Sequence, residues 1–242
     1  MRSSDTDIGP QHLRGGFTLL ELLVVVALIA TLAGMLLPSL RRAKALAVRT
    51  TCASNLHGIN MALGQYLADN GGVYPAIAKD PWPGTNVWLW MGRGWRNILA
   101  KEMNLTVETN RPSLLYCKAD VSAAKYEYTS YSYSMCFYHS REQIDSLSSA
   151  AQCYGAGALD SIGQKGDNLR RAEAKVLIGE WLSNHEKIAV DNGWWCKAGR
   201  RLFLMADGHV EYLWAGDILP ANDQLPDANL TVHGIEGADV GH

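Results

Sequence analysis

The residues with the clearest chemical potential lie near the N-terminus, where one charged side chain meets a long apolar run. Gly15 and Gly16 end a polar segment, and Phe17 opens a stretch whose single charged residue up to position 40 is Glu21. An ionised carboxylate near a bilayer centre costs about 2.5–3.5 kcal/mol on insertion scales, so it needs a partner. A cut between Gly16 and Phe17 would create an α-amino group one helical turn before Glu21 and so supply that partner.

The apolar stretch is long enough to cross a membrane. A helix over residues 17–40 rises about 36 Å, more than a hydrocarbon core of about 30 Å. Arg41, Arg42 and Lys44 follow directly as a basic stop. A cleavable secretion signal and a plain uncleaved anchor are the competing interpretations. The length of the run and its early carboxylate argue against a secretion signal, and the unpartnered carboxylate argues against a plain anchor.

These residues carry a specific resemblance. Gly16-Phe17-Thr18-Leu19-Leu20-Glu21, followed by the apolar run and Pro38, resembles the type III signal sequence of type IV prepilins and type II secretion pseudopilins. The resemblance implies that a prepilin peptidase cuts after Gly16, that Phe17 becomes N-methylated, and that Glu21 supports subunit addition to a filament. It also implies that other pilin-like subunits and an inner-membrane assembly platform are partners. The protein would cross the inner membrane once, with an extracytoplasmic C-terminal domain and a filament in the periplasm or on the cell surface.

A long helix is predicted to continue beyond the membrane. Pro38 removes one helical hydrogen bond and is expected to bend the helix without ending it. Apolar residues then recur at spacings of three and four, which predicts an amphipathic helix that packs against the following domain, and Asn70-Gly71-Gly72 supplies its end. The apolar stripe comprises Val48, Cys52, Leu56, Ile59, Leu63 and Tyr66.

The remainder of the chain is predicted to form strands and loops. We expect strands near 114–117, 128–137 and 175–180, and a hairpin over 201–214 in which Asp207-Gly208 forms a type I′ turn. The expected fold class is α+β and pilin-like, with the long N-terminal helix packed on a small antiparallel sheet. The expected organisation is a leader (1–16), a transmembrane and assembly helix (17–40), an amphipathic spine (41–70), a β domain (71–215) and a flexible C-terminal tail (216–242).

A second resemblance lies within the β domain. The segments 52–75, 114–120, 177–180 and 203–213 resemble the prepilin-type proteins that carry the H-X9-DG domain. The position ten residues before Asp207, where that family has the His of its name, is Lys197 in this chain. The chain therefore resembles either a divergent member or a relative of that family, and a role attached to that His does not carry over.

Enzymatic and nucleic-acid-binding functions are not expected. A net charge of −2 gives no basic field for nucleic acid, and the sequence contains no nucleophile elbow, zincin, Walker or dinucleotide-binding motif. His185-Glu186 has no second metal ligand at helical spacing, and we interpret it as a solvated loop. We therefore expect a structural filament subunit, and a membrane-tethered enzyme is the least favoured class.

The alternative function is a membrane-anchored extracytoplasmic binding module. Tryptophans are concentrated in the Pro- and Gly-rich segment 82–95 and at Trp194-Trp195. Exposed tryptophans there would form a platform for a sugar or a partner protein. Packing within the core or the loops is the competing interpretation, and we favour it.

Five cysteines, none in a C-x-x-C arrangement, argue against a zinc ribbon and leave disulfides open outside the cytoplasm. A bond between Cys52 and Cys117 would fasten the sheet to the helix and stabilise the fold by about 2–4 kcal/mol. Sequence does not fix the pairing, so a bond from Cys136 to Cys153 or Cys196 is equally open.

Acidic residues near the C-terminus raise the question of a calcium site. Some major pseudopilins are similar in using acidic C-terminal loops to hold a calcium ion, whose flexible oxygen coordination suits such loops. Asp207 and Asp217 are the candidates here, with Asp223 and Asp227 further along. A hairpin turn and a solvated acidic tail account for the same residues, and we expect no cofactor.

Overall fold

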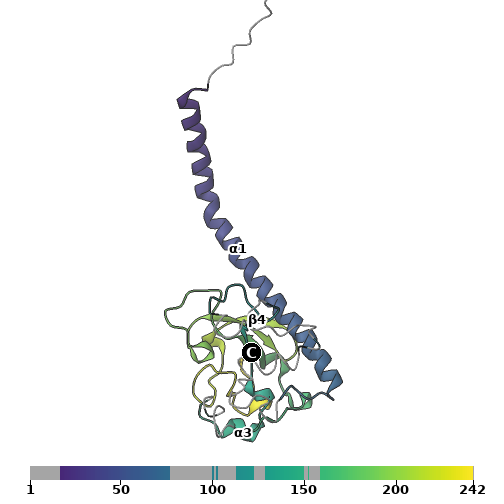
Figure 1. Cartoon of the computed structure of the whole chain (residues 1–242). Helices are drawn as coiled ribbons and strands as arrows, with labels where there is room; N and C mark the ends of the chain where they lie inside the picture. The colour runs from purple at the N-terminus through teal and green to yellow at the C-terminus, as the bar shows by residue number, and fades with distance from the viewer. Residues whose placement is uncertain are drawn as a thin grey trace, which may run out of the picture. The chain divides into compact units, whose positions relative to one another are not determined.

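The chain forms two compact units, Met1–Ala45 and Leu46–His242. The computed structural model describes residues 17–76, 113–122, 129–149 and 159–241, together with Ala100, Glu102 and Gln152. Helix α1 (Leu19–Asp69) contributes residues to both units, and the second unit also holds the sheet (Figure 1). The expected leader lies outside the described residues.

Helix α1 runs through Pro38 without interruption and ends where the sequence predicts. Gly71 and Gly72 follow it with φ angles of 63° and 75°, in the left-handed region that glycine adopts readily. The amide of Gly72 donates to the carbonyl of Leu67 at 2.8 Å, which satisfies one of the carbonyls left open at the helix end.

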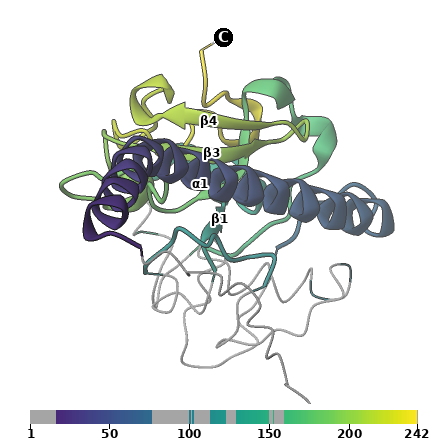
Figure 2. The same cartoon turned by 90° about the horizontal axis from the view of Figure 1, so that it is seen from above.

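The apolar stripe of α1 packs into the core of the second unit. Cys52, Leu56, Ile59 and Leu63 are buried in the main hydrophobic cluster, while Val48 and Tyr66 pack at its margin. Figure 2 shows this part of the helix running alongside the sheet. The prediction of a core-facing stripe is confirmed.

The sheet contains four antiparallel strands in the order β1-β2-β3-β4. Their bounds are β1 (Tyr131–Tyr133), β2 (Val176–Glu180), β3 (Arg200–Met205) and β4 (Val210–Trp214). Every residue of β1 and β2 is buried, although β1 is an edge strand of the sheet. A Cβ at Gly179 would lie 2.3 Å from the Phe203 ring, so close packing of β2 on β3 requires glycine there. The α+β, pilin-like fold class is confirmed.

Two local predictions in this region are wrong. Residues 114–117 form a turn and an irregular segment and not a strand. The amide of Tyr116 donates to the carbonyl of Ser113 at 3.1 Å, and the single bond of the Ser130 amide to the carbonyl of Leu115, at 2.8 Å, does not extend into a ladder. The β3–β4 hairpin is present, but Gly208 alone has a positive φ, 97°, and Asp207 does not. A type I′ turn needs positive φ at both residues, so this turn places only its glycine in the left-handed region.

Short helices fill the connections. Helix α3 (Arg141–Asp145) begins with a capping box in which Ser140 and Gln143 bond to each other's backbone amides. The 3₁₀ helices are η2 (Met135–Phe137), η4 (Gly166–Asn168), η5 (Ala172–Ala174), η6 (Gly193–Trp195), η7 (Ala215–Asp217) and η8 (Gly234–Glu236).

The expectation of a flexible tail after residue 215 is wrong. Leu230, Ile235 and Val240 are buried in the main core. The amide of Asp239 donates to the carbonyl of Ala174 at 2.8 Å, beside the start of β2. The acidic residues that suggested a solvated tail are thus part of a segment that returns to the sheet and completes the core.

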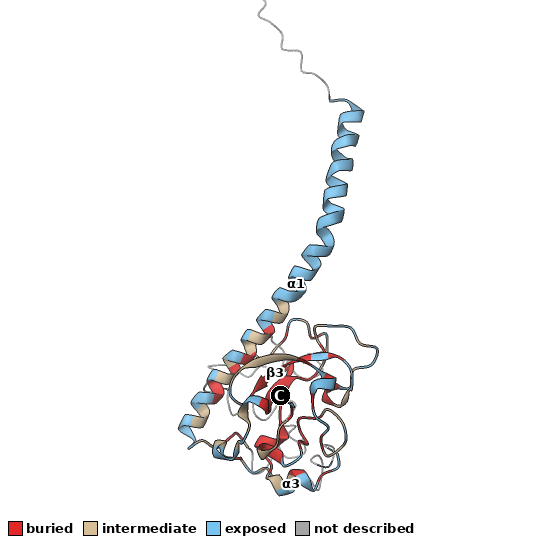
Figure 3. Ribbon diagram, turned by 180° about the vertical axis from the view of Figure 1, so that it is seen from behind, coloured by how far each residue is buried: buried red, intermediate tan, exposed pale blue. Residues whose placement is uncertain are grey.

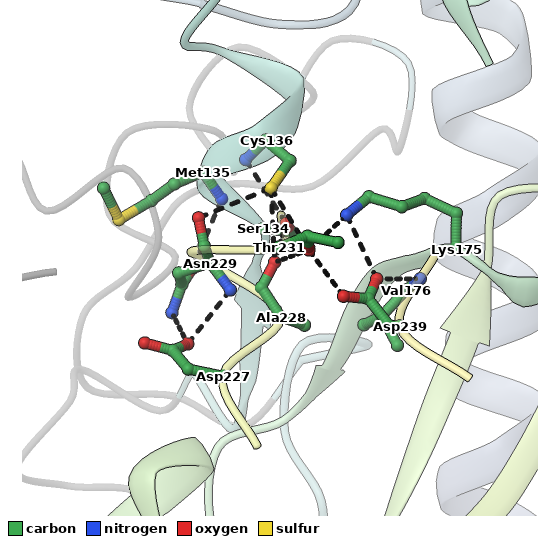
Figure 4. A network of polar contacts seen from close by, with 10 residues as sticks. All are labelled: Ser134, Met135, Cys136, Lys175, Val176, Asp227, Ala228, Asn229, Thr231 and Asp239. Atoms are coloured by element: carbon green, nitrogen blue, oxygen red, sulfur yellow. Dashed lines mark hydrogen bonds and ion pairs between the residues drawn. The ribbon is translucent and has the colours of Figure 1, made fainter. Parts of the chain in front are cut away.

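A buried charge pair holds this segment in place (Figure 4). Lys175 Nζ lies 3.1 Å from Asp239 Oδ2, and both side chains are almost fully buried. The Thr231 hydroxyl accepts a hydrogen bond from Lys175 and donates one to Asp239. The same carboxylate accepts the amide of Val176 at 2.8 Å. Because each charge has several partners, the cost of removing it from water is largely offset.

Candidate functional site

The first turn of α1 is closed by a capping box between Thr18 and Glu21. The Thr18 hydroxyl accepts from the Glu21 amide at 3.2 Å, and Glu21 Oε2 accepts from the Thr18 amide at 2.9 Å and its hydroxyl at 2.8 Å. This T-x-x-E pattern fixes the start of a helix by satisfying amides that have no partner within it. The sequence-based predictions did not include this cap, although the T-x-x-E spacing is its signal. The box holds the carboxylate beside the residue that follows Phe17.

The part of α1 around and after Glu21 is exposed in the single chain. Every residue from 17 to 47 is exposed, Phe17 among them, and Figure 3 shows this part of α1 in the colour of exposed residues. Helix α1 is long and apolar enough to cross a membrane, and it is the one such helix in the described part of the chain. Apolar side chains of this kind are stable only where lipid or another protein covers them.

The stretch has a defined beginning and end. Glu21 is the one acidic residue in its first turn, and Arg41, Arg42 and Lys44 lie exposed beyond its apolar part. Pro38 lies within the helix between them. The geometry thus points to a class of protein with an apolar helical stretch long enough to cross a membrane. Such a stretch has a single carboxylate near its N-terminal end and basic residues after its C-terminal end.

Comparison with known proteins identifies the motif. The family model for the prokaryotic N-terminal methylation motif matches residues 12–37. No curated protein and no solved structure matches the chain. The match covers the expected cleavage position, Phe17, Glu21 and the apolar run, and it confirms the resemblance to prepilins and pseudopilins. The motif indicates a type IV pilin-like or pseudopilin-like subunit that is processed, and with the apolar helix it indicates a membrane-anchored protein. The resemblance to H-X9-DG proteins stays a prediction.

The cysteines of the second unit are placed as follows. Cys52 on α1 and Cys117 form a disulfide with their Cα atoms 5.3 Å apart, one of the pairings that the sequence left open. Cys136 is a buried free thiol whose Sγ lies 3.4 Å from the carbonyl of Asn229, and Cys196 is a partly buried free thiol. Cys153 lies outside the described residues. The bond ties the helical spine to the segment before β1.

The four aspartates considered for calcium each serve a local turn or loop. Asp207 accepts from the His209 amide at 3.1 Å, Asp217 from the Trp214 amide at 3.2 Å, and Asp223 from the Leu225 amide at 3.0 Å. Asp227 is buried and accepts from Trp195 Nε1 at 2.8 Å. Burial raises the pKa of Asp227 to about 7. No cluster of three or more metal-ligating side chains found among the described residues includes any of the four.

Of the tryptophans that the structure describes, Trp181 and Trp194 are buried, Trp195 is partly buried and Trp214 is exposed. Trp194 is buried and donates from Nε1 to the carbonyl of Glu180 at 2.8 Å, and Trp195 packs edge-on against Trp181. The platform interpretation is therefore wrong for Trp194-Trp195. Trp82, Trp88, Trp90 and Trp95 lie outside the described residues.

His185 is also placed differently from the prediction. Its side chain is only 4% exposed, and its Nε2 lies 3.0 Å from Oε1 of the buried Glu180. The interpretation of His185 as part of a solvated loop is wrong, because its partner lies five residues earlier, at the end of β2. Lys197, at the position of the family's histidine, is exposed.

Proposed function

We propose that this chain is a filament subunit of the type IV pilus or type II secretion pseudopilus class. Prepilin peptidase cuts between Gly16 and Phe17, Phe17 becomes the methylated N-terminus, and the subunit polymerises through the apolar part of α1. The observation that carries the proposal is the methylation motif over residues 12–37 joined to the exposed apolar part of α1. The role is structural and needs no catalytic group.

The balance of insertion energies supports a membrane-inserted precursor. Residues 22–37 include six leucines, three valines and one isoleucine. Each favours insertion by about 0.3–0.6 kcal/mol at a helix centre, so together they contribute about 3–6 kcal/mol. One carboxylate at the centre costs about 2.5–3.5 kcal/mol and less near the interface, so the helix inserts in spite of Glu21. The free-energy cost of the unpaired Glu21 carboxylate in the membrane remains after insertion, and pairing it during assembly would remove that cost.

Glu21 sets the register of assembly in this proposal. In the intact chain the capping box with Thr18 satisfies one of its two carboxylate oxygens. After cleavage, the α-amino group of Phe17, in the same or a neighbouring subunit, supplies a positive charge for this carboxylate. Small and branched apolar side chains pack helix against helix, while the pairing of a charge in a low-dielectric setting selects one alignment.

The proposed partners follow from this pathway. They are prepilin peptidase, an inner-membrane assembly platform and other pilin-like subunits, identical or different. The chain crosses the inner membrane once, and residues beyond the basic boundary form the extracytoplasmic domain. We expect neither nucleic acid nor a cofactor to be required.

Analysis of the mature N-terminus tests the processing step. The full chain is produced in a host with active prepilin peptidase and, in parallel, in one with an inactive peptidase, and is then extracted from membranes. We expect the active host to yield a chain beginning at methylated Phe17 and the inactive host a chain beginning at Met1. A chain beginning at Met1 in both hosts, or at a small residue near 43–45, overturns the proposal.

The variant Glu21→Gln tests the assembly step, because it keeps the size of the side chain and removes the charge. We expect normal membrane insertion and at least about a tenfold loss of incorporation into sheared filaments, equivalent to about 1.4 kcal/mol. Glu173→Gln, at an exposed carboxylate of the second unit, is the matched control and should assemble normally. Equal incorporation of both variants would remove the proposed role of Glu21.

A further inference from the structure

Four side chains from distant parts of the sequence meet beside the disulfide. The ligand atoms of Cys52, Cys117, Glu180 and His185 all lie within 4.8 Å of one another. The two cysteines and Glu180 are buried, and His185 is partly exposed as a residue although its side chain is almost covered. We propose that the dithiol form of this protein binds one Zn²⁺ through these four side chains, and that formation of the disulfide closes the site.

The distances suit tetrahedral zinc. Zinc binds thiolate sulfur at about 2.3 Å and imidazole nitrogen or carboxylate oxygen at about 2.0–2.2 Å, so neighbouring ligand atoms stand about 3.3–3.8 Å apart. His185 Nε2 lies 3.6 Å from Cys117 Sγ and 3.0 Å from Glu180 Oε1. One nitrogen therefore faces both a sulfur and a carboxylate oxygen. An ion between them requires that the disulfide is reduced, that the two sulfurs separate, and that His185 and Glu180 move slightly apart.

The surroundings of Glu180 orient it for this role. Its Oε2 accepts from the amide of Leu202 on β3 at 3.0 Å, which fixes that oxygen in the sheet. Its Oε1 is left toward His185, with Asn184 Nδ2 at 3.3 Å. Backbone support of a ligating carboxylate is the usual device that positions it for a metal ion. β2 and β3 thus present one oxygen toward the two sulfurs.

The charge of the site supports a cation. Glu180 has a fully buried side chain, and the ion-pair partner that the structure shows for it is His185, which is positive only when protonated. A buried carboxylate is costly unless a positive charge is close. Two thiolates would add further negative charge, and a divalent cation at the centre compensates them together with the carboxylate.

The binding step involves no electron transfer. The thiols of Cys52 and Cys117 each lose a proton to solvent, two Zn–S bonds form, and neutral His185 and ionised Glu180 supply the other two ligands. The disulfide has no thiolate to offer, so the two forms exclude each other. The dithiol is the form in which the chain is synthesised, and a thiol or phosphine reductant regenerates it from the disulfide. The inference is independent of filament assembly.

Metal titration of the full chain in detergent tests the site. Protein treated with a phosphine reductant and air-oxidised protein are each titrated with Co²⁺, whose thiolate charge-transfer absorption reports sulfur ligands, and with Zn²⁺ in competition with a chromophoric chelator. We expect one ion per reduced chain with the charge-transfer band, and at least about tenfold weaker binding by the oxidised chain. Failure of the reduced chain to bind overturns the proposal.

Variants separate a four-ligand site from binding by thiols alone. His185→Asn and Glu180→Gln should each weaken Zn²⁺ binding by the reduced chain at least about tenfold. His209→Asn and Cys196→Ser, at a histidine and a thiol outside the site, should leave it unchanged. Equal affinity of all four variants overturns the proposal. Near-UV circular dichroism follows the fold, and a reduced domain that unfolds and that Zn²⁺ does not restore also overturns it.

Discussion

The two units of this chain use apolar side chains in opposite ways. Residues 17–45 expose every one of them, whereas the unit Leu46–His242 buries a continuous core that runs from α1 to the C-terminal segment. The hydrophobic effect acts on both, because it depends only on the area removed from water. In the second unit that area is removed by folding, so in the first it must be removed by lipid or by other subunits.

The two units also differ in how far their charged groups find partners within the chain. The apolar part of α1 carries one carboxylate, and a local capping box satisfies part of it. The second unit encloses charges and matches them with partners, as in the pairs Lys175–Asp239 and Arg201–Asp191, with N–O distances of 3.1 Å and 2.8 Å. The contrast indicates that the second unit pairs its buried charges internally. The apolar part of the first unit needs lipid or another protein as its partner.

Removing the first unit gives the largest expected effect. A chain that starts at Leu46 loses the exposed apolar helix and keeps the disulfide and the core residues of α1. We expect it to be recovered without detergent as a folded, monomeric domain, while a chain that starts at Phe17 stays in the membrane fraction. Cell fractionation followed by size-exclusion chromatography makes the measurement. A truncated chain that remains with membranes would contradict this contrast between the units, because the second unit would then carry its own membrane contact.

Replacing Lys175 by Met probes whether the second unit depends on matched charges. The variant leaves the Asp239 carboxylate buried, 2% exposed, without its cation. Removing one partner of a buried pair typically costs about 3–5 kcal/mol. We expect a loss of that size in the free energy of urea unfolding of the chain that starts at Leu46.

The control for Lys175 is an ion pair of the same unit whose cation is exposed and whose carboxylate has a second partner, Arg141. Arg170 lies 2.7 Å from Glu236, but 71% of its side chain is exposed. An exposed pair contributes about 0–1 kcal/mol, so Arg170→Met should unfold at nearly the wild-type urea concentration. If both variants lost the same stability, burial would not be what distinguishes these charges.

Local sequence patterns were sufficient for the parts of the fold that depend on neighbours in the chain. The stripe from Val48 to Tyr66 predicted the buried face of α1, and the glycines after Asn70 marked its end. The run 175–180 became β2, and the alternation around Asp207-Gly208 became the hairpin. Each of these follows from periodicity or backbone preference over a few residues.

The same reasoning failed where side chains meet across long separations. The C-terminal segment looked solvated because its aspartates are polar, yet Asp239 is matched by Lys175, and that pairing cannot be read from either residue alone. His185 looked isolated because its partners are Glu180 in a buried strand and a sulfur at position 117. Spacing rules for metal sites search for ligands close in sequence and so miss such a group.

Two buried titratable groups of the second unit test how far its interior is closed to water. Burial lowers the pKa of His139 from 6.5 to about 4, and burial raises the pKa of Asp227 from 3.8 to about 7. Between pH values near 4 and 6.5, unfolding lets His139 take up a proton, so its contribution to stability rises with pH. Over the same window unfolding makes Asp227 release a proton, so its contribution falls with pH. Each slope is about 1.4 kcal/mol per pH unit, and the two oppose each other.

Single substitutions should reveal the two opposed slopes. In the chain that starts at Leu46 we expect His139→Gln to leave the slope of Asp227, so that its stability falls as pH rises from about 4 to 6.5. Asp227→Asn should leave the slope of His139, so that its stability rises over the same window. Urea unfolding at several pH values between the two limits measures both slopes relative to that of the unsubstituted domain. Parallel curves for both variants would show that these groups do not titrate as their burial requires, and that the second unit is less closed to water than its packing indicates.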